Sequence, residues 1–242
     1  MGVIQEIRPP APGLAQTLAL MTQLTPGQMI PPGIVYGLSG LVPAQVLATA
    51  PLWRSLEVEV RRDIVLAMIE AGESDFETDF SMIGMLILDD DDPTVRGLAI
   101  ELCAYIEDLA HMNTLFEIAQ QDDSDIVRAA AMKALGVFVL QGELGQAPGD
   151  AVEPIVKYLV RTVRDRRENS EVRARALEAI GYSGNESVVT EIRKAYEGDD
   201  DRLKTAAIFA MGASGDEQWA ETIVNELERG SAENRFEAAR AA

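Results

Sequence analysis

One short phrase recurs along the chain and constrains its fold more than any other feature. It is clearest in residues 122–136, DDSDIVRAAAMKALG, where acidic residues precede a Val-Arg pair and small or apolar residues follow it. The phrase recurs around six basic residues: Arg61, Arg96, Arg128, Arg173, Lys204 and Arg235. Small or apolar residues follow each of these at positions +3, +6 and +7, which lie on one face of an α-helix. Each phrase therefore predicts an amphipathic helix that packs through small side chains.

The spacing of the phrase predicts a second helix in each repeat. The differences between residue numbers 61, 96, 128, 173, 204 and 235 are 35, 32, 45, 31 and 31, which suits two helices and two turns. Second helices are expected at residues 80–88, 112–119, 152–166, 187–196 and 216–228. A loop at residues 141–150 accounts for the longest interval. The pattern favours an all-α fold, a superhelix of about five to six helix pairs.

The beginning of the chain differs from the repeats. Residues 1–52 contain eight of the eleven prolines and only two charged side chains, Glu6 and Arg8. Prolines at this density exclude a long helix, and only residues 14–24 are expected to form a short one. We predict two parts: an apolar, proline-rich arm at residues 1–38 and a repeat solenoid at residues 39–242. The arm would cover the open end of the repeats, dock onto a partner or associate with a membrane surface.

The repeated phrase resembles the HEAT repeat, especially the short HEAT-like type of phycobilisome-lyase proteins, over residues 39–242. Residues 181–242 look like the tail of uncharacterised bacterial HEAT-repeat proteins. The resemblance implies a right-handed α–α superhelix in which a basic residue and a nearby Asp tie adjacent repeats together. It assigns this structural ladder to Arg61, Arg96, Arg128, Arg173, Lys204 and Arg235. Because the chain ends at Ala242 within a first helix, we expect it either to continue or to self-associate there.

A fold of this kind hosts many functions, so the resemblance bears only weakly on activity. It implies a non-catalytic scaffold or adaptor whose concave surface, lined by the second helices, grips a partner segment. The alternative is an accessory enzyme or chaperone resembling bilin lyases, which holds a chromophore against a carrier protein. The net charge of −19 repels nucleic acids and anionic lipid and favours a basic or extended protein segment.

Two features are candidates for contact with a partner. Arg161, Arg164, Arg166 and Arg167 form the one basic cluster, beside Tyr158. They either complement the dipole at a helix C-terminus and pair with nearby acids, or dock an acidic partner segment. Trp219, at the start of a second helix, either packs into the core or, if exposed, anchors a partner.

Catalytic, cofactor and metal sites are not expected. His111 is the only histidine, which excludes metal sites built from two or more histidines. The acidic runs at residues 89–92, 122–125 and 199–201 precede helices and are expected to cap them. Cys103 is the single cysteine, so no intrachain disulfide can form. The first residues lack a secretory pattern and no stretch predicts a membrane span, so a cytoplasmic location is expected.

Overall fold

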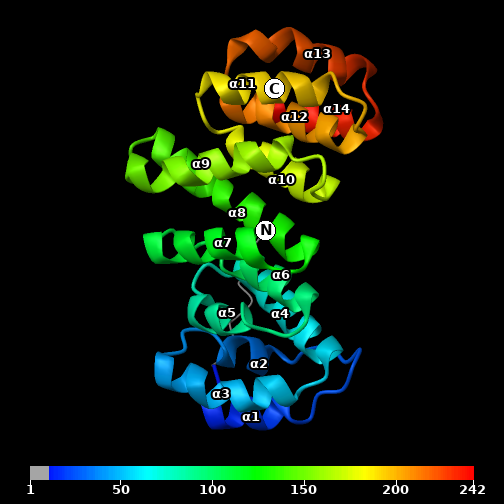
Figure 1. Cartoon of the computed structure of the whole chain (residues 1–242). Coiled ribbons are helices and arrows are strands. Elements are labelled where there is room, and N and C mark those ends of the chain that lie inside the picture. Colours follow the sequence, from blue (N-terminus) through cyan, green and yellow to red (C-terminus); the bar gives the residue numbers. More distant parts are fainter. Residues whose placement is uncertain (1–10) are drawn as a thin grey trace, which may run out of the picture. The chain divides into compact units, whose positions relative to one another are not determined.

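The computed structural model describes residues 11–242, and this part of the chain contains α-helices without a strand (Figure 1). The predicted all-α class built from helix pairs is therefore confirmed. The chain divides into two compact units, residues 1–106 and residues 107–242, which are described separately here as unit 1 and unit 2. Within residues 11–242, no helix is both long enough and apolar enough to cross a membrane.

The helices of unit 1 form two layers. Their bounds are α1 Leu14–Met21, α2 Pro32–Gly37, α3 Pro43–Ser55, α4 Val58–Ser74, α5 Ser81–Ile87 and α6 Pro93–Leu102. Helices α2, α4 and α6 pack side by side in one layer, and α1, α3 and α5 pack in the other. The repeat phrases at residues 61 and 96 begin α4 and α6.

Unit 2 has the same layered arrangement. Its helices are α7 Leu109–Gln121, α8 Asp125–Glu143, α9 Gly149–Arg164, α10 Ser170–Ile180, α11 Glu186–Tyr196, α12 Asp201–Ser214, α13 Ala220–Arg229 and α14 Ala232–Ala241, with a 3₁₀-helix, η1, at Glu217–Trp219. The four remaining repeat phrases begin α8, α10, α12 and α14, which we call the first helices of this unit. The expected second helices appear as α7, α9, α11 and α13. The helix-pair prediction from the spacing therefore holds throughout this unit.

Acidic side chains cap several of these helices, as the sequence predicts. The Asp92 side chain accepts a hydrogen bond from the backbone N–H of Val95 at the start of α6. The Asp200 side chain accepts bonds from the N–H groups of Arg202 and Leu203 in α12. Such bonds satisfy donors that have no partner inside the helix and contribute about 0.5–2 kcal/mol each. The acidic runs at residues 89–92 and 199–201 thus belong to the helix starts, whereas no side chain caps α8 at the run of residues 122–125, where a cap was also predicted.

Small residues bring the first helices of unit 2 into backbone contact. A Cβ added to Gly181 in the turn after α10 would lie 2.7 Å from the Cα of Ala210 in α12. A Cβ on Gly136 of α8 would lie 3.3 Å from the Cα of Ala179 in α10. The +6 alanine of one repeat thus meets the glycine that follows the phrase of the previous repeat. Second helices lie farther apart, with α9 and α11 making the closest approach among them.

The predicted N-terminal arm is helical from Leu14, before the expected start of the helices at residue 39. Helices α1 and α2 occupy the same two layers as the later pairs of unit 1. Met21 and Ile34 are completely buried, as is Leu38. The boundary at residue 38 stays a prediction, and residues 1–10 of the predicted arm lie outside the described part of the chain.

A pair of glycines in α2 tests whether these residues belong to the core of unit 1. A Cβ at Gly37 would lie 2.9 Å from Cγ2 and 3.0 Å from Cβ of the buried Thr17 in α1, whereas one at Gly33 would meet only the tip of Leu20, at 3.4 Å, and a proline ring. We expect Gly37→Ala to lower the free energy of unfolding of unit 1 by about 1–3 kcal/mol, and Gly33→Ala to leave it nearly unchanged. The emission of Trp53 during urea unfolding, in a Trp219→Phe background, measures both. Equal unfolding curves for the two variants would identify residues 11–38 as a peripheral arm.

Candidate functional site

The six basic residues of the repeat phrases share two kinds of contact. Four donate a hydrogen bond to a backbone carbonyl that precedes their own helix, from Arg96 to Asp90, Arg128 to Asp122, Arg173 to Val163 and Arg235 to Gly230. These bonds tie the start of each first helix to the turn or second helix before it.

Four of the six also approach an acidic residue that lies between their own phrase helix and the next one. Arg61 lies 2.7 Å from Asp91, and Arg128 lies 2.8 Å from Glu168. Lys204 is 3.0 Å from Glu226, and Arg173 approaches Asp200 at 4.0 Å. We propose that these contacts form the predicted ladder, in which the acidic partner is Asp or Glu.

The exposed side of the first helices in unit 2 carries a row of aromatic rings. The ring of Tyr182, after α10, meets Phe209 of α12 edge to face, with centroids 6.3 Å apart. The guanidinium of Arg240 in α14 lies 5.2 Å from the centroid of Phe209 and 5.9 Å from that of Phe236. Tyr182 and Phe209 are half-buried, whereas Phe236 is 63% exposed. These four residues from three successive repeats form what we call the aromatic face.

Charged side chains border the aromatic face on α10. Both carboxylate oxygens of Glu178 accept hydrogen bonds from Arg175, at 2.8 and 2.9 Å. Burial raises the pKa of Glu178 above its ordinary value, although Arg175 opposes the shift. Burial of its hydroxyl likewise raises the pKa of Tyr182, against the field of Arg240. The surface therefore combines part-buried rings with oriented charges, a composition common at protein interfaces.

The spacing of the helices corrects one expectation about this face. Second helices were expected to line the concave surface. Within unit 2, however, the first helices are the closely spaced layer, because Gly136 and Gly181 allow their backbones to touch. A stack of helix pairs bends toward its closely spaced layer, so we infer that the first helices line the inner side of unit 2. The sequence reasoning missed Tyr182, Phe209, Phe236 and Arg240, although aromatic residues outside the +3, +6 and +7 positions were a usable signal.

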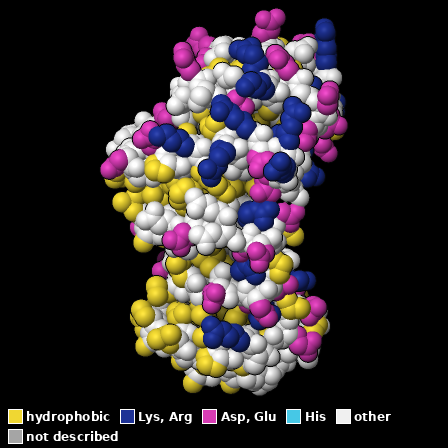
Figure 2. Space-filling model, in the orientation of Figure 1, with side chains coloured by type: hydrophobic (Ala, Val, Ile, Leu, Met, Phe, Trp, Pro, Cys, Tyr) yellow, Lys and Arg dark blue, Asp and Glu magenta, His cyan; other side chains and the backbone are white. Residues whose placement is uncertain are grey.

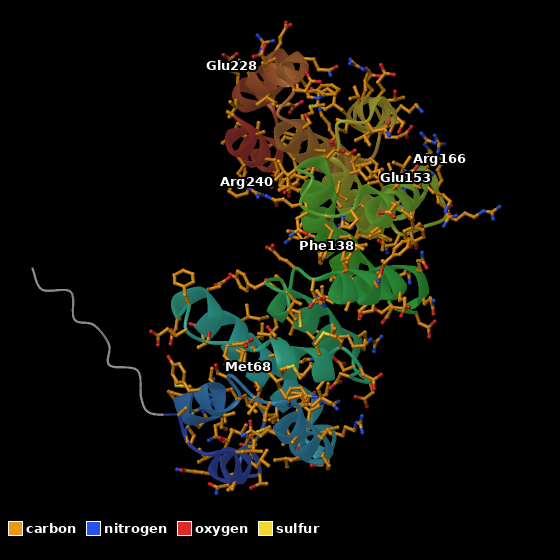
Figure 3. The ribbon with its side chains drawn as sticks, turned by 90° about the vertical axis from the view of Figure 1, so that its left-hand side faces the viewer. Met68, Phe138, Glu153, Arg166, Glu228 and Arg240 are labelled. Carbon is orange, nitrogen blue, oxygen red and sulfur yellow. The ribbon has the colours of Figure 1, made fainter. Side chains whose placement is uncertain are left out.

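The predicted partner residues lie on the opposite layer, on α9 and η1. Figure 3 shows Glu153 of α9 and Arg166, which follows α9, on the side of unit 2 opposite to Arg240. Arg161 and Arg164 are exposed on α9, and Arg167 is exposed in the turn that follows it.

The rings of Tyr158 and Trp219 each pack against an arginine side chain in this layer. The hydroxyl of Tyr158 donates to the carbonyl of Ala119 at 2.9 Å, and its ring lies beneath Arg161. Trp219 is only 3% exposed and is covered by Arg193. Its indole therefore packs into the core, which is the first of the two alternatives, and Trp219 is not an exposed anchor.

His111 and Cys103 are the only histidine and cysteine of the chain, and both are buried. His111 is 3% exposed in α7, and burial lowers the pKa of its imidazole, against the field of Asp108. Burial raises the pKa of the Cys103 thiol to about 12, so the thiolate is scarcely populated near neutral pH. Within residues 11–242, no group of three or more His, Cys, Asp and Glu side chains could hold a metal ion.

Comparison with known families gives one match. A family model described as HEAT repeats matches residues 85–168 and residues 158–242, nearly two thirds of the chain. The matched region begins in α5 and includes every helix of unit 2. No curated protein matches the sequence.

Proposed function

Because the chain belongs to the HEAT-repeat family, we propose that it is a non-catalytic protein-binding scaffold or adaptor. HEAT repeats commonly mediate protein–protein interaction. The aromatic face is the observation that carries the proposal for this chain. It would bind an extended segment of another protein along the first helices of unit 2.

The chemistry of the aromatic face supports this role. Tyrosine and arginine dominate the residues that contribute most to protein binding, and phenylalanine supplies a large apolar surface. Arg240 is held against two rings and also pairs with Glu237 at 3.0 Å, so little freedom is lost when a partner fixes it. The rings recur on consecutive first helices, which suits a segment that crosses several repeats.

The overall charge also influences which partner fits this face. Unit 2 has 26 acidic and 16 basic residues, so its field favours a segment that is neutral or basic overall. Glu178 and Glu237 already pair with Arg175 and Arg240, and their carboxylates add negative charge that would attract a basic residue flanking an apolar anchor. We therefore propose an extended segment with apolar side chains and at least one Lys or Arg.

Removing one exposed ring should test the proposal directly. We expect Phe236→Ser to reduce recovery of the true partner at least about tenfold in affinity capture from an extract, because aromatic anchors contribute disproportionately to binding. Phe76→Ser is the matched control, because Phe76 is 90% exposed in unit 1 and lies outside the aromatic face. Quantitative mass spectrometry compares the proteins captured by the two variants and the unmodified chain. Equal recovery of every captured protein by Phe236→Ser and Phe76→Ser would refute the proposal for this face.

A further inference from the structure

A second surface of unit 2 has the opposite chemistry from the chain as a whole. Five exposed cations lie on two neighbouring second helices, a group we call the basic strip: Lys157, Arg161, Arg164, Arg193 and Lys194. Arg164 of α9 lies 3.0 Å from Glu191 of α11, which places the cations of the two helices on one continuous surface. Figure 2 shows Lys and Arg side chains gathered over this part of unit 2. Such a surface is unexpected in a chain with a net charge of −19.

Aromatic rings hold two of these cations in place. The Arg161 guanidinium lies 5.1 Å from the ring centroid of Tyr158, and that ring also meets Phe116 of α7 edge to face at 5.5 Å. Arg193 lies 5.0 Å from the ring of the buried Trp219. A guanidinium supported by a ring keeps its edge and its N–H donors available to a second ligand. These arginines are thus fixed before a partner arrives.

The nearby carboxylates pair with only some of the cations in the basic strip. Arg164 and Lys194 share the single carboxylate of Glu191, each at 3.0 Å. Burial of Glu191 works against its charge, but hydrogen bonds from these two cations hold its pKa below the ordinary value. Lys157 pairs with Glu153 on the exposed surface of α9. Within the described residues, Arg161 and Arg193 have no carboxylate at salt-bridge distance.

The spacing of the cations on α9 matches an extended peptide. Lys157, Arg161 and Arg164 lie at positions i, i+4 and i+7 on one helix face, with successive steps of about 6 and 4.5 Å along the axis at a rise of about 1.5 Å per residue. Alternate side chains of an extended peptide point to the same side about 6.6 Å apart. Acidic residues two positions apart would therefore meet Lys157 and Arg161 of α9.

We propose that the basic strip binds an extended acidic segment of a partner protein, with carboxylates at alternate positions. Arg161 and Arg193 bind the carboxylates, because neither guanidinium has a carboxylate at salt-bridge distance in the described residues, and Arg193 uses only one N–H, for the Gln218 side chain at 3.1 Å. A nucleic acid fits less well, since its continuous charge would also meet the field of the surrounding acidic residues. The strip lies on the opposite layer from the aromatic face, so the two surfaces can act independently.

A synthetic probe tests this assignment without a known partner. The probe is a fluorescein-labelled twelve-residue peptide of alternating Glu and Ser, and fluorescence anisotropy measures its affinity for the full chain. A Lys-Ser peptide and a single-stranded oligothymidine of similar length are the comparison probes. We expect Arg161→Glu and Arg193→Glu each to weaken Glu-Ser binding by about tenfold, since each change removes one charged contact and adds a repulsive one. We also expect binding to weaken as the salt concentration rises.

The matched control is Arg54→Glu, which changes the net charge equally at an exposed position in unit 1. It should leave Glu-Ser binding within about twofold of the unmodified chain, because Arg54 is not part of the basic strip and the change alters only the net charge. Circular dichroism of each variant checks that the helices remain folded. The proposal is overturned if Glu-Ser does not bind, if Arg54→Glu weakens binding as much as Arg161→Glu, or if oligothymidine binds more tightly than the peptide. None of these outcomes affects the test of the aromatic face, which uses Phe236.

Discussion

Arg61→Met should lower the free energy of unfolding of unit 1 by about 3–5 kcal/mol, because it leaves a buried carboxylate without its cation. The side chain of Arg61 is 7% exposed, and that of Asp90 is 1% exposed. Asp90 lies 3.5 Å from Arg61 and accepts a 2.7 Å hydrogen bond from the indole N–H of Trp53. Burial raises the pKa of Asp90, whereas the indole and Arg61 oppose that shift. Removing Arg61 therefore leaves Asp90 either charged and poorly compensated or protonated at a cost.

The neighbouring arginine supplies the control for this prediction. Arg62 lies on α4 with Arg61 and pairs with Asp92 at 2.6 Å. Its side chain is 37% exposed, so Arg62→Met should lower the free energy of unfolding much less. A second change, Asp90→Asn, should recover part of the stability lost in Arg61→Met, because it removes the uncompensated charge. Trp53 emission during urea unfolding, in a Trp219→Phe background, measures all three variants. An equal loss of unfolding free energy in Arg61→Met and Arg62→Met would show that burial of the Arg61–Asp90 pair does not determine its contribution to stability.

The helix pairs could be predicted because one residue pattern specifies both packing and turns. The small residues at +3, +6 and +7 of each phrase become the buried side of a first helix, as Ala131 and Leu135 do in α8. Acidic residues such as Asp200 start helices through local hydrogen bonds, which depend only on neighbours in sequence. These signals depend on residues that are close in sequence, so they can be recognised without knowledge of the tertiary structure.

The helices at residues 14–37 were harder to anticipate because they lack the repeat phrase. Pro31 is the N-cap residue of α2, and Pro32 is its first residue, where a missing N–H costs little. The prolines thus mark where a short helix begins as well as where long helices are excluded. Their packing depends on contacts such as Thr17 against Gly37, which join positions 20 residues apart and leave no local pattern.

The candidate surfaces depended on information that a single sequence does not hold. The Arg161 cluster and Tyr158 were recognisable by their proximity in sequence, and the structure adds that one ring supports the cation. The aromatic face joins Tyr182, Phe209 and Phe236, which are 27 residues apart along the chain and therefore fall out of step with the 31-residue interval of the phrases. Which layer is inner depends on helix spacing, and that emerged only from the backbone contacts. The phycobilisome-lyase type and the bilin-lyase-like alternative stay predictions.

Gly181→Ala should lower the free energy of unfolding of unit 2 by about 1–3 kcal/mol, although alanine is the better helix former. The added Cβ would lie 2.7 Å from the Cα and 2.8 Å from the Cβ of Ala210, so neighbouring backbones must separate. Gly136→Ala, with its nearest backbone atom at 3.3 Å, should have a smaller effect. Gly149→Ala at the start of α9 should instead stabilise the unit by about 0.4–1 kcal/mol, because nothing lies within 4 Å of its Cβ.

The order of these three variants matters more than any single value. If close backbone contact between first helices holds unit 2 together, stability should fall from Gly149→Ala through Gly136→Ala to Gly181→Ala. Hydrogen exchange measured on peptides from α8, α10 and α12 reports the stability of this layer separately from unit 1. Stabilisation by all three substitutions would mean that helix propensity outweighs contact between repeats. It would also remove the reason for placing the aromatic face on the inner side, because that placement rests on the same close approach of α8, α10 and α12.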